Sequence, residues 1–248
     1  MSYETFAVIV VAIAVGSFAK GLTGIGLPII TIPILSGILG AEHAIVSMTI
    51  PVFVSNIQIV WRYRKLVTTI PRLGTALACA VAGTLVGVYI LASLDDRALI
   101  NLIIVWIGIY LLNLVFNPNF RLTGKAAVIG SPILATLAGV SQGATGMAGP
   151  VVATWIHSYR MEKEAYVFAV SVMFLFISGT QVAAVAVGGL MDHQKTIEGL
   201  LAAIPTLLFV PLGMRTIKYV SPRMFNWIIL SCIVVMEARL IWKQFIAA

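Results

Sequence analysis

Charged residues are scarce in this sequence. They make up 10% of the 248 residues, whereas a soluble domain of this size carries about a quarter. Apolar residues account for 60%, and the mean hydropathy is +1.04. Such a composition belongs in lipid, where a run of roughly 20 apolar residues spans the hydrocarbon core as a helix. It excludes an ordinary soluble domain and predicts an integral membrane protein.

Cysteine and histidine are also rare, with two and three copies. Cys79 and Cys232 both lie in apolar runs, so we expect small buried residues rather than a disulfide or metal framework. The histidines show no metal-ligand spacing, and the sequence carries no motif of a hydrolase or a nucleotide-binding enzyme. The opening MSYE lacks the positively charged region of a cleavable signal peptide. We therefore expect no enzyme, no cofactor and no metal site.

The net charge is +7, which on a soluble protein would point to nucleic acid. Here, however, the basic residues stand at the ends of apolar segments, which is the pattern of membrane topology. We therefore expect a lipid bilayer, and not a nucleic acid, as the partner of these charges.

Spanning helices and two interrupted regions divide the chain. Two regions, about 5–40 and 126–158, are too long for one crossing, and a Gly/Pro stretch interrupts each: GLTGIGLP at 21–28 and QGATGMAGP at 142–150. Glycine weakens a helix, and proline removes a backbone donor and clashes with the preceding turn. Each region therefore predicts a short helix, a break and a second short helix. Ordinary spanning helices are expected at about 43–61, 73–92, 98–116, 165–188, 197–214 and 224–242.

The two halves of the chain resemble each other. Aligning GLTG at 21–24 with GATG at 143–146 places Pro28 on Pro150 and Glu42 on Glu164 without a gap. With small insertions, the alignment also pairs Gln58 with Gln181, Gly87 with Gly213 and Arg97 with Arg223. A chance match between apolar segments does not explain a shared G-x-T-G-x-x-x-P followed by glutamate at the same distance. The sequence thus predicts a first transmembrane repeat at 1–120 and a second at 121–248.

The distribution of basic residues predicts how these repeats are oriented. If each broken region enters and returns to one side, eleven basic residues share the side of the 62–72 loop and three lie opposite. If each broken region crosses once, the division becomes eight against six. Because cytoplasmic loops are enriched in Lys and Arg, we expect the first arrangement, with both termini in the periplasm. Each repeat is then a broken-helix hairpin plus three spanning helices, and the repeats are inverted, which is typical of secondary transporters.

The breaks themselves suggest an anion site. Backbone groups at membrane depth must be buried in protein or line a watery cavity. Proline lacks a backbone N–H, but in the first turn of a helix that N–H would have no hydrogen-bond partner within the helix. The starts of these helices present free N–H groups and the positive end of the helix dipole. The candidate substrate-binding residues are Lys20, Thr23, Gly24, Gly26, Pro28, Asn56, Gln58, Gln142, Thr145, Gly146, Gly149, Pro150 and Gln181.

Structural explanations compete with these roles. Lys20 is an intramembrane charge, which by default marks a functional path, but it could also reach water at the end of a short first helix. The glycines could serve close packing alone, and Asn56, Gln58 and Gln181 could make interhelical hydrogen bonds. For Glu42 and Glu164, we expect stabilisation of helix N-termini rather than a proton relay.

The paired motifs G-x-T-G-x-G-x-P and G-x-T-G-x-x-G-P, each followed by an acid in the next helix, resemble those of the TauE/SafE family of sulfite exporters. The resemblance covers nearly the whole chain. It implies transport of small sulfur-containing anions, such as sulfite, sulfonates, sulfoacetate or thiosulfate, across the bacterial inner membrane. Two departures from symmetry affect the expected anion contacts: Leu27 stands where the second motif has Gly149, and Lys20 is matched by Gln142.

The sequence therefore predicts an all-α integral membrane protein of two inverted repeats, which exports a small anion by alternating access. A passive anion channel and a membrane scaffold subunit without transport remain as alternatives. The substrate identity, the coupling ion and the oligomeric state, a homo-oligomer included, stay open.

Overall fold

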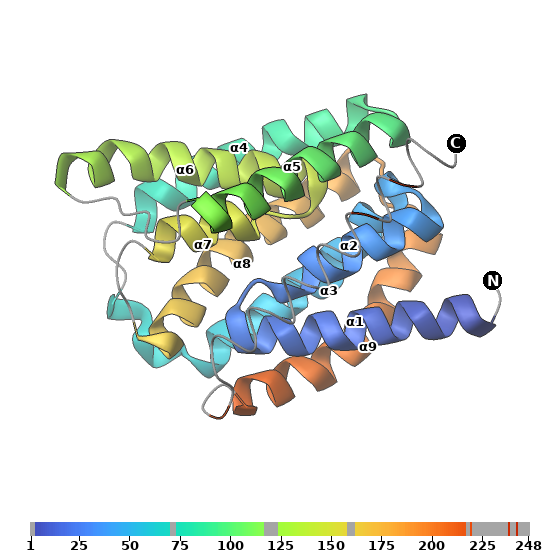
Figure 1. Cartoon of the computed structure of the whole chain (residues 1–248), viewed down its shortest axis with the longest axis horizontal. Helices are drawn as coiled ribbons and strands as arrows, with labels where there is room; N and C mark the ends of the chain where they lie inside the picture. The colour runs from blue at the N-terminus through green and yellow to red at the C-terminus, as the bar shows by residue number, and fades with distance from the viewer. Residues whose placement is uncertain are drawn as a thin grey trace.

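The computed structural model describes residues 3–69, 73–116, 124–157 and 162–216, with the single residues 219, 238 and 242. This part of the chain is built of helices and contains no strand (Figure 1). The elements in chain order are α1 (Tyr3–Thr23), α2 (Gly26–Leu39), α3 (Ala41–Arg62), the 3-10 helix η1 (Arg64–Thr69), α4 (Leu73–Ser93), α5 (Asp96–Phe116), α6 (Gly124–Thr145), α7 (Gly149–His157), α8 (Lys163–Val187) and α9 (His193–Thr216).

Five of the described helices, α1, α3, α4, α8 and α9, are long and apolar enough to cross a membrane. The all-α membrane fold predicted from composition is therefore confirmed. Helices lie at five of the six segments predicted to span, and the sixth, 224–242, lies outside the described residues.

Both broken regions are confirmed as two helices separated by a short interruption, but one detail of the prediction was wrong. The first helix of each pair is not short: α1 has 21 residues and α6 has 22. Only the second helices are short, with 14 residues in α2 and 9 in α7. Each interruption lies late in its region because the glycine of the GLTG or GATG motif comes after some 20 residues that are free to continue the helix.

Helix packing pairs each broken region with a helix from the other half of the chain. Gly21 of α1 meets Gly213 of α9, where a Cβ added to Gly21 would lie 3.0 Å from the Gly213 Cα. A Cβ added to Gly143 of α6 would likewise lie 2.8 Å from the carbonyl carbon of Gly87 on α4. Small residues allow such close approach of two backbones within a membrane. The sequence comparison equates Gly21 with Gly143 and Gly87 with Gly213, so matched residues make matched contacts.

The order of contacts along these pairs fixes the helix directions. Ser17 of α1 donates a hydrogen bond to Thr206 of α9 at 3.1 Å, and one turn further along both helices Gly21 contacts Val210. The two helices are therefore parallel. On α6 and α4, Gly139 contacts Ala80, and one turn further Gly143 contacts Thr84, so this pair is parallel as well.

The bundle has two distinct ends. At one end, which we call the Lys195 end, α1, α3, α5 and α9 begin and α2 finishes (Figure 1). At the other, the η1 end, α3 finishes at η1 and α4, α6 and α8 begin. The α1–α2 region therefore starts from and returns to the Lys195 end, and the α6–α7 region starts from and returns to the η1 end. Consequently, α1 and its counterpart α6 run in opposite directions.

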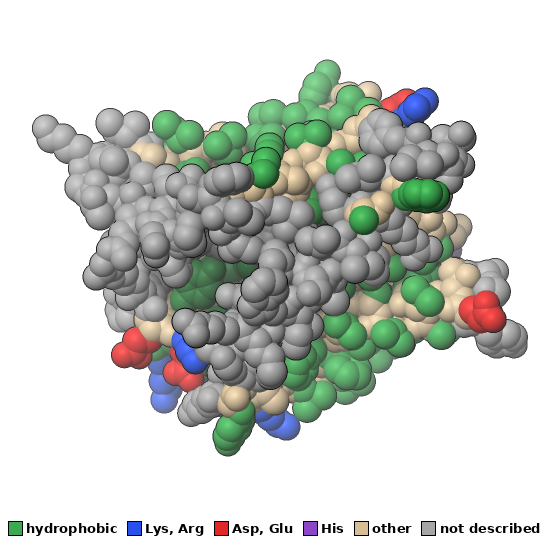
Figure 2. Space-filling model, in the orientation of Figure 1, with side chains coloured by type: hydrophobic (Ala, Val, Ile, Leu, Met, Phe, Trp, Pro, Cys, Tyr) green, Lys and Arg blue, Asp and Glu red, His purple; other side chains and the backbone are tan. Residues whose placement is uncertain are grey.

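The sides of the bundle are apolar, and its mainly apolar interior also buries several polar side chains. Large apolar side chains such as Leu85, Tyr89 and Leu208 are 53%, 75% and 61% exposed on the sides of the bundle. Figure 2 shows apolar side chains over these sides, and charged ones towards the helix ends. Buried positions hold polar groups, among them Lys20, Asn56, Gln142 and Gln181. An apolar exterior, with a few polar groups enclosed in the core, suits a protein surrounded by lipid.

Candidate functional site

The first break is built by Thr23 and Gly24 at the end of α1. The Gly24 N–H donates to the Lys20 carbonyl at 2.7 Å and closes the last turn of the helix. Gly24 then adopts φ +81°, a left-handed conformation that glycine reaches without a Cβ penalty. The Thr23 hydroxyl donates to the Ala19 carbonyl at 2.8 Å and accepts the Ile25 N–H at 3.3 Å.

The second break repeats this geometry residue for residue. The Gly146 N–H donates to the Gln142 carbonyl at 2.8 Å, and Gly146 has φ +71°. The Thr145 hydroxyl donates to the Ser141 carbonyl at 2.8 Å and accepts the Met147 N–H at 3.3 Å. The shared T-G dipeptide therefore specifies one local structure in both halves.

These contacts change the role expected for Thr23 and Thr145. We predicted that their hydroxyls would donate to an anion. Each hydroxyl has a single proton, and in this structure that proton goes to a carbonyl of the preceding turn. The threonines stabilise the breaks by satisfying backbone groups that helix ends leave without partners.

The second helices begin next to each other. A Cβ added to Gly149 in the first turn of α7 would lie 3.3 Å from the Ile25 Cβ at the start of α2. Pro28 is the third residue of α2 and Pro150 the second of α7, so both prolines occupy the first turn, as predicted. No side chain caps the first turn of α2. Two helix N-termini, which favour negative charge, thus meet inside the bundle.

Gly26 brings this junction against the end of α1. A Cβ added to Gly26 would lie 2.7 Å from the Ala19 carbonyl carbon and 2.8 Å from the backbone nitrogen of Lys20. Only glycine allows α2 to start this close to Lys20.

Lys20 is completely buried, with a relative exposure of 0%. Its ammonium has no hydrogen-bond partner in the described part of the chain, and its one close aromatic contact there is Phe174 of α8, 4.2 Å from Nζ to the ring centroid. A cation over a ring face is stabilised by about 0.5–2 kcal/mol, whereas an uncompensated buried charge costs several kcal/mol. The alternative that Lys20 reaches water is therefore not supported by this structure.

Gln142 of α6, the counterpart of Lys20, contacts the same helix, α8, about two turns further along, at Gln181. Its side-chain amide donates to the Gln181 Oε1 at 2.8 Å, and Gln181 returns a bond to the Gln142 carbonyl at 2.7 Å. Phe174 and Gln181 are seven residues apart, so one face of α8 carries the contacts of both Lys20 and Gln142, about 10 Å apart along the axis. Lys20 and Gln142 thus both contact the face of α8 that carries Phe174 and Gln181.

Asn56 and Gln58 have different surroundings. Asn56 is fully buried on α3, and its amide donates to the Val52 carbonyl at 2.8 Å within the same helix. The Gln58 amide donates to the Leu207 carbonyl of α9 at 3.1 Å, which is an interhelical bond of the kind named as the alternative. Gln58 therefore bonds to α9, whereas its counterpart in the second repeat, Gln181, lies on α8 and bonds to Gln142.

Several buried polar atoms lack a hydrogen-bond partner in the described structure. They include the Lys20 Nζ, the Asn56 Oδ1, the Gln142 Oε1 and the Ser171 Oγ. Most buried polar groups in proteins are satisfied, so a group of exceptions calls for an explanation such as a bound ligand or water. Ser171 and Phe174 were missed from the sequence, because a serine and a phenylalanine in an apolar run give no local signal of a site.

Comparison with known proteins identifies the group to which this sequence is related. No curated protein and no solved structure is significantly similar to it. The sequence profile of the family described as "Sulfite exporter TauE/SafE" matches residues 8–240, which includes both breaks and every candidate residue. On this match, the chain belongs to the TauE/SafE sulfite exporter family.

Proposed function

We propose that this chain exports a small anion of the sulfite, sulfonate or thiosulfate class by alternating access. Membership of a sulfite exporter family supports transport of such anions rather than catalysis. The observation that carries the proposal is Lys20, an ammonium with 0% exposure and without a hydrogen-bond partner among the described residues. An anion bound beside it would supply the missing counter-charge and hydrogen-bond acceptors.

The junction of the two breaks can complete such a site. The N-termini of α2 and α7 meet there, and their N–H groups and dipoles attract negative charge. Gly24 and Gly146 allow the left-handed turns that precede these helices, and Gly26 and Gly149 allow the helix starts to pack closely against Ala19 and Ile29. Reorientation of the Gln142 and Asn56 amides would add donors, because each amide has two N–H groups.

Alternating access follows from the proposal that residues 1–120 and 121–248 are inverted repeats. In its favour, α1 and α6 run in opposite directions, and the glycine contacts of α1 with α9 match those of α6 with α4. A transporter of this kind binds its substrate where the discontinuous helices of its two repeats meet. Rocking of one repeat against the other would expose that point to each side of the membrane in turn.

We place the chain in the bacterial inner membrane with the η1 end in the cytoplasm. Arg62, Arg64, Lys65, Lys163 and Arg215 lie at or next to that end. On the opposite end Arg97 and Lys195 are the basic residues that the structure describes. This asymmetry follows the positive-inside rule.

A thermal-shift screen of purified protein tests the proposal against sulfite, thiosulfate, sulfoacetate, taurine, sulfate and chloride. A small sulfur-containing anion should raise the melting temperature in proportion to the logarithm of its concentration. An unchanged melting temperature with every anion would contradict the proposal and favour a membrane scaffold. Binding combined with currents that do not saturate, and with no accumulation against a gradient in vesicles, would favour a passive channel.

A further inference from the structure

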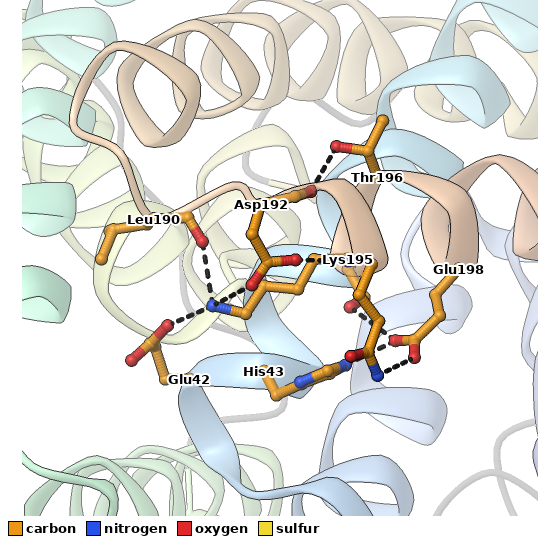
Figure 3. Close-up of polar contacts among 9 residues, drawn as sticks. Glu42, His43, Leu190, Asp192, Lys195, Thr196 and Glu198 are labelled. Carbon is orange, nitrogen blue, oxygen red and sulfur yellow. Dashed lines mark hydrogen bonds and ion pairs between the residues drawn. The ribbon is translucent and has the colours of Figure 1, made fainter.

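A second polar group lies away from the breaks, at the Lys195 end of the bundle (Figure 3). Lys195 Nζ lies 2.7 Å from the Glu42 Oε1, 2.9 Å from the Leu190 carbonyl and 3.6 Å from the Asp192 Oδ2. These contacts satisfy the ammonium completely. Glu42 lies in the first turn of α3, as expected for a residue that stabilises a helix N-terminus, and its carboxylate also pairs with Lys195 of α9.

Beside this ion pair, His43 of α3 meets Glu198 of α9. The His43 Nε2 lies 2.5 Å from the Glu198 Oε2, and a proton must lie between two such atoms. Gln194 donates to the other oxygen of Glu198 at 2.9 Å, and the Ser47 hydroxyl lies 3.4 Å from Oε2. The two side chains are 22% and 34% exposed, so protons can reach them from water at this end.

The charges around the pair are mostly negative. Glu42 and Asp96 come from the starts of α3 and α5, Asp192 from the loop before α9, and Lys195 from α9 itself. The neighbouring helix α2 carries no charge, and Glu4 of α1 is exposed. The Lys195 N–H, followed by the charge of that side chain, lowers the pKa of the Asp192 carboxyl, which therefore stays ionised at neutral pH.

A hydrogen bond between α9 and α1 lies between this pair and the centre of the bundle. Thr206 lies eight residues after Glu198 on α9 and hydrogen-bonds Ser17, which precedes Lys20 by one turn of α1. Since the two helices are parallel, the rise of 1.5 Å per residue places Glu198 about 17 Å from Lys20 along the bundle. The pair is thus separate from the anion site but joined to it by two packed helices.

The other repeat has no equivalent pair. In the alignment that places Glu42 on Glu164, His43 falls on Ala165. A pair required only to hold α3 against α9 would have no reason to be titratable, because the Glu42–Lys195 bridge already joins these helices.

We propose that the His43–Glu198 pair binds a proton that is linked to the anion beside Lys20, so that the pH of the water at the Lys195 end changes how tightly the anion is held. The inference rests on the function proposed above. The proton comes from water at the Lys195 end, is held on the His43 imidazole against the Glu198 carboxylate, and returns to water when the anion has left. A unit negative charge about 17 Å away, at an effective dielectric constant of about 20, favours the imidazolium about fivefold. By reciprocity, the bound proton strengthens anion binding by the same factor.

Titration calorimetry of the purified full chain with thiosulfate tests this linkage, because thiosulfate keeps its charge over the range in which histidine titrates. Repeating the titration in buffers of different ionisation enthalpy counts the protons taken up per anion. We expect proton uptake in the wild type, with anion affinity falling as the pH rises. His43→Gln, which keeps a hydrogen-bond donor but cannot titrate, should show neither effect. His193→Gln, an exposed histidine at the same end, should behave as wild type.

The outcomes separate the two proposals. Thiosulfate binding without proton uptake in the wild type would overturn this inference and leave the anion site intact. Uptake that persists in both His43→Gln and Glu198→Gln would assign the proton to another group and equally overturn it. Absence of binding by thiosulfate and by every other anion in the screen would overturn the proposed function and, with it, this linkage. Because Lys20 is itself titratable and lies at the anion site, uptake by the wild type supports the inference only when a variant of the pair abolishes it, and Glu198→Gln provides this comparison if His43→Gln does not fold.

Discussion

Replacing Lys20 by glutamine makes the first half of the chain resemble the second, where Gln142 occupies the equivalent position. The variant loses the ammonium but keeps a donor of similar reach, the two breaks and the helix N-termini. Anion binding should therefore weaken without disappearing. A charge-assisted hydrogen bond contributes on the order of 1.5–3 kcal/mol, which corresponds to roughly a ten- to hundredfold loss of affinity.

The stability of the anion-free protein should change in the opposite sense. Lys20 contacts the Phe174 ring, and losing a cation–π contact costs about 0.5–2 kcal/mol. Removing a buried charge that has no counter-charge recovers several kcal/mol of desolvation. The Lys20→Gln protein should consequently melt at or above the wild-type temperature without anion, and gain less from added anion.

The assay is thermal shift and titration calorimetry on purified protein at two salt concentrations. Lys20→Arg should retain weaker binding, because the planar guanidinium is larger than the ammonium, and Lys20→Glu should not bind. Lys65→Gln, an equal change of charge at an exposed position of η1, is the control and should behave as wild type. Equal anion affinities for the wild type and Lys20→Glu would refute the reasoning.

Three further predictions concern the breaks, the helix pairs and the orientation. Gly24→Leu and Gly146→Leu should abolish transport while the protein stays in the membrane, because a side chain is strained at φ +81° and +71°. Gly37→Leu, with open space around the glycine, is the control. Normal uptake by vesicles carrying either break variant would contradict the proposed site. Gly87→Leu and Gly213→Leu should remove most folded protein from detergent extracts, since a Cβ would strike the backbone of the paired helix, whereas Gly108→Leu should be tolerated. Cysteines at Leu94 and Lys65 should react with an impermeant reagent from the periplasm and the cytoplasm, respectively; labelling of both from one side would overturn the hairpin arrangement.

The local structure of the breaks could be predicted from the sequence because it depends on residues close together in the chain. Glycine and proline interrupt a helix through their own backbone properties, and the repeat placed Gly24 on Gly146 before any contact was known. The lengths predicted for α1 and α6 were wrong, because in an apolar run nothing except the glycine itself marks where a helix must stop. The threonine hydroxyls were assigned to an anion, since the sequence does not show that a carbonyl four residues earlier takes their proton.

Long-range contacts were beyond prediction. Nothing in the sequence indicates that α1 packs on α9 and α6 on α4, so that each broken region lies against a helix of the other half. Phe174 could not be distinguished from other aromatic residues of α8 until Lys20 lay over its ring. Likewise, His43 and Glu198 are 155 residues apart, and only the parallel course of α1 and α9 and the start of α3 beside them bring the pair together.

In the proposed anion site, the two halves of the chain contribute different groups. Matched backbone turns at Gly24 and Gly146 provide two helix N-termini, which attract any anion but discriminate little between anions. The mismatched residues supply the rest: Lys20 brings a full charge, Gln142 brings a neutral amide already bonded to Gln181, and His43 has Ala165 as its counterpart. A second buried lysine in place of Gln142 would add another desolvation cost of several kcal/mol and would bind an anion too strongly to release it. We therefore expect that one cation at this junction, rather than two, lets an anion bind and still leave.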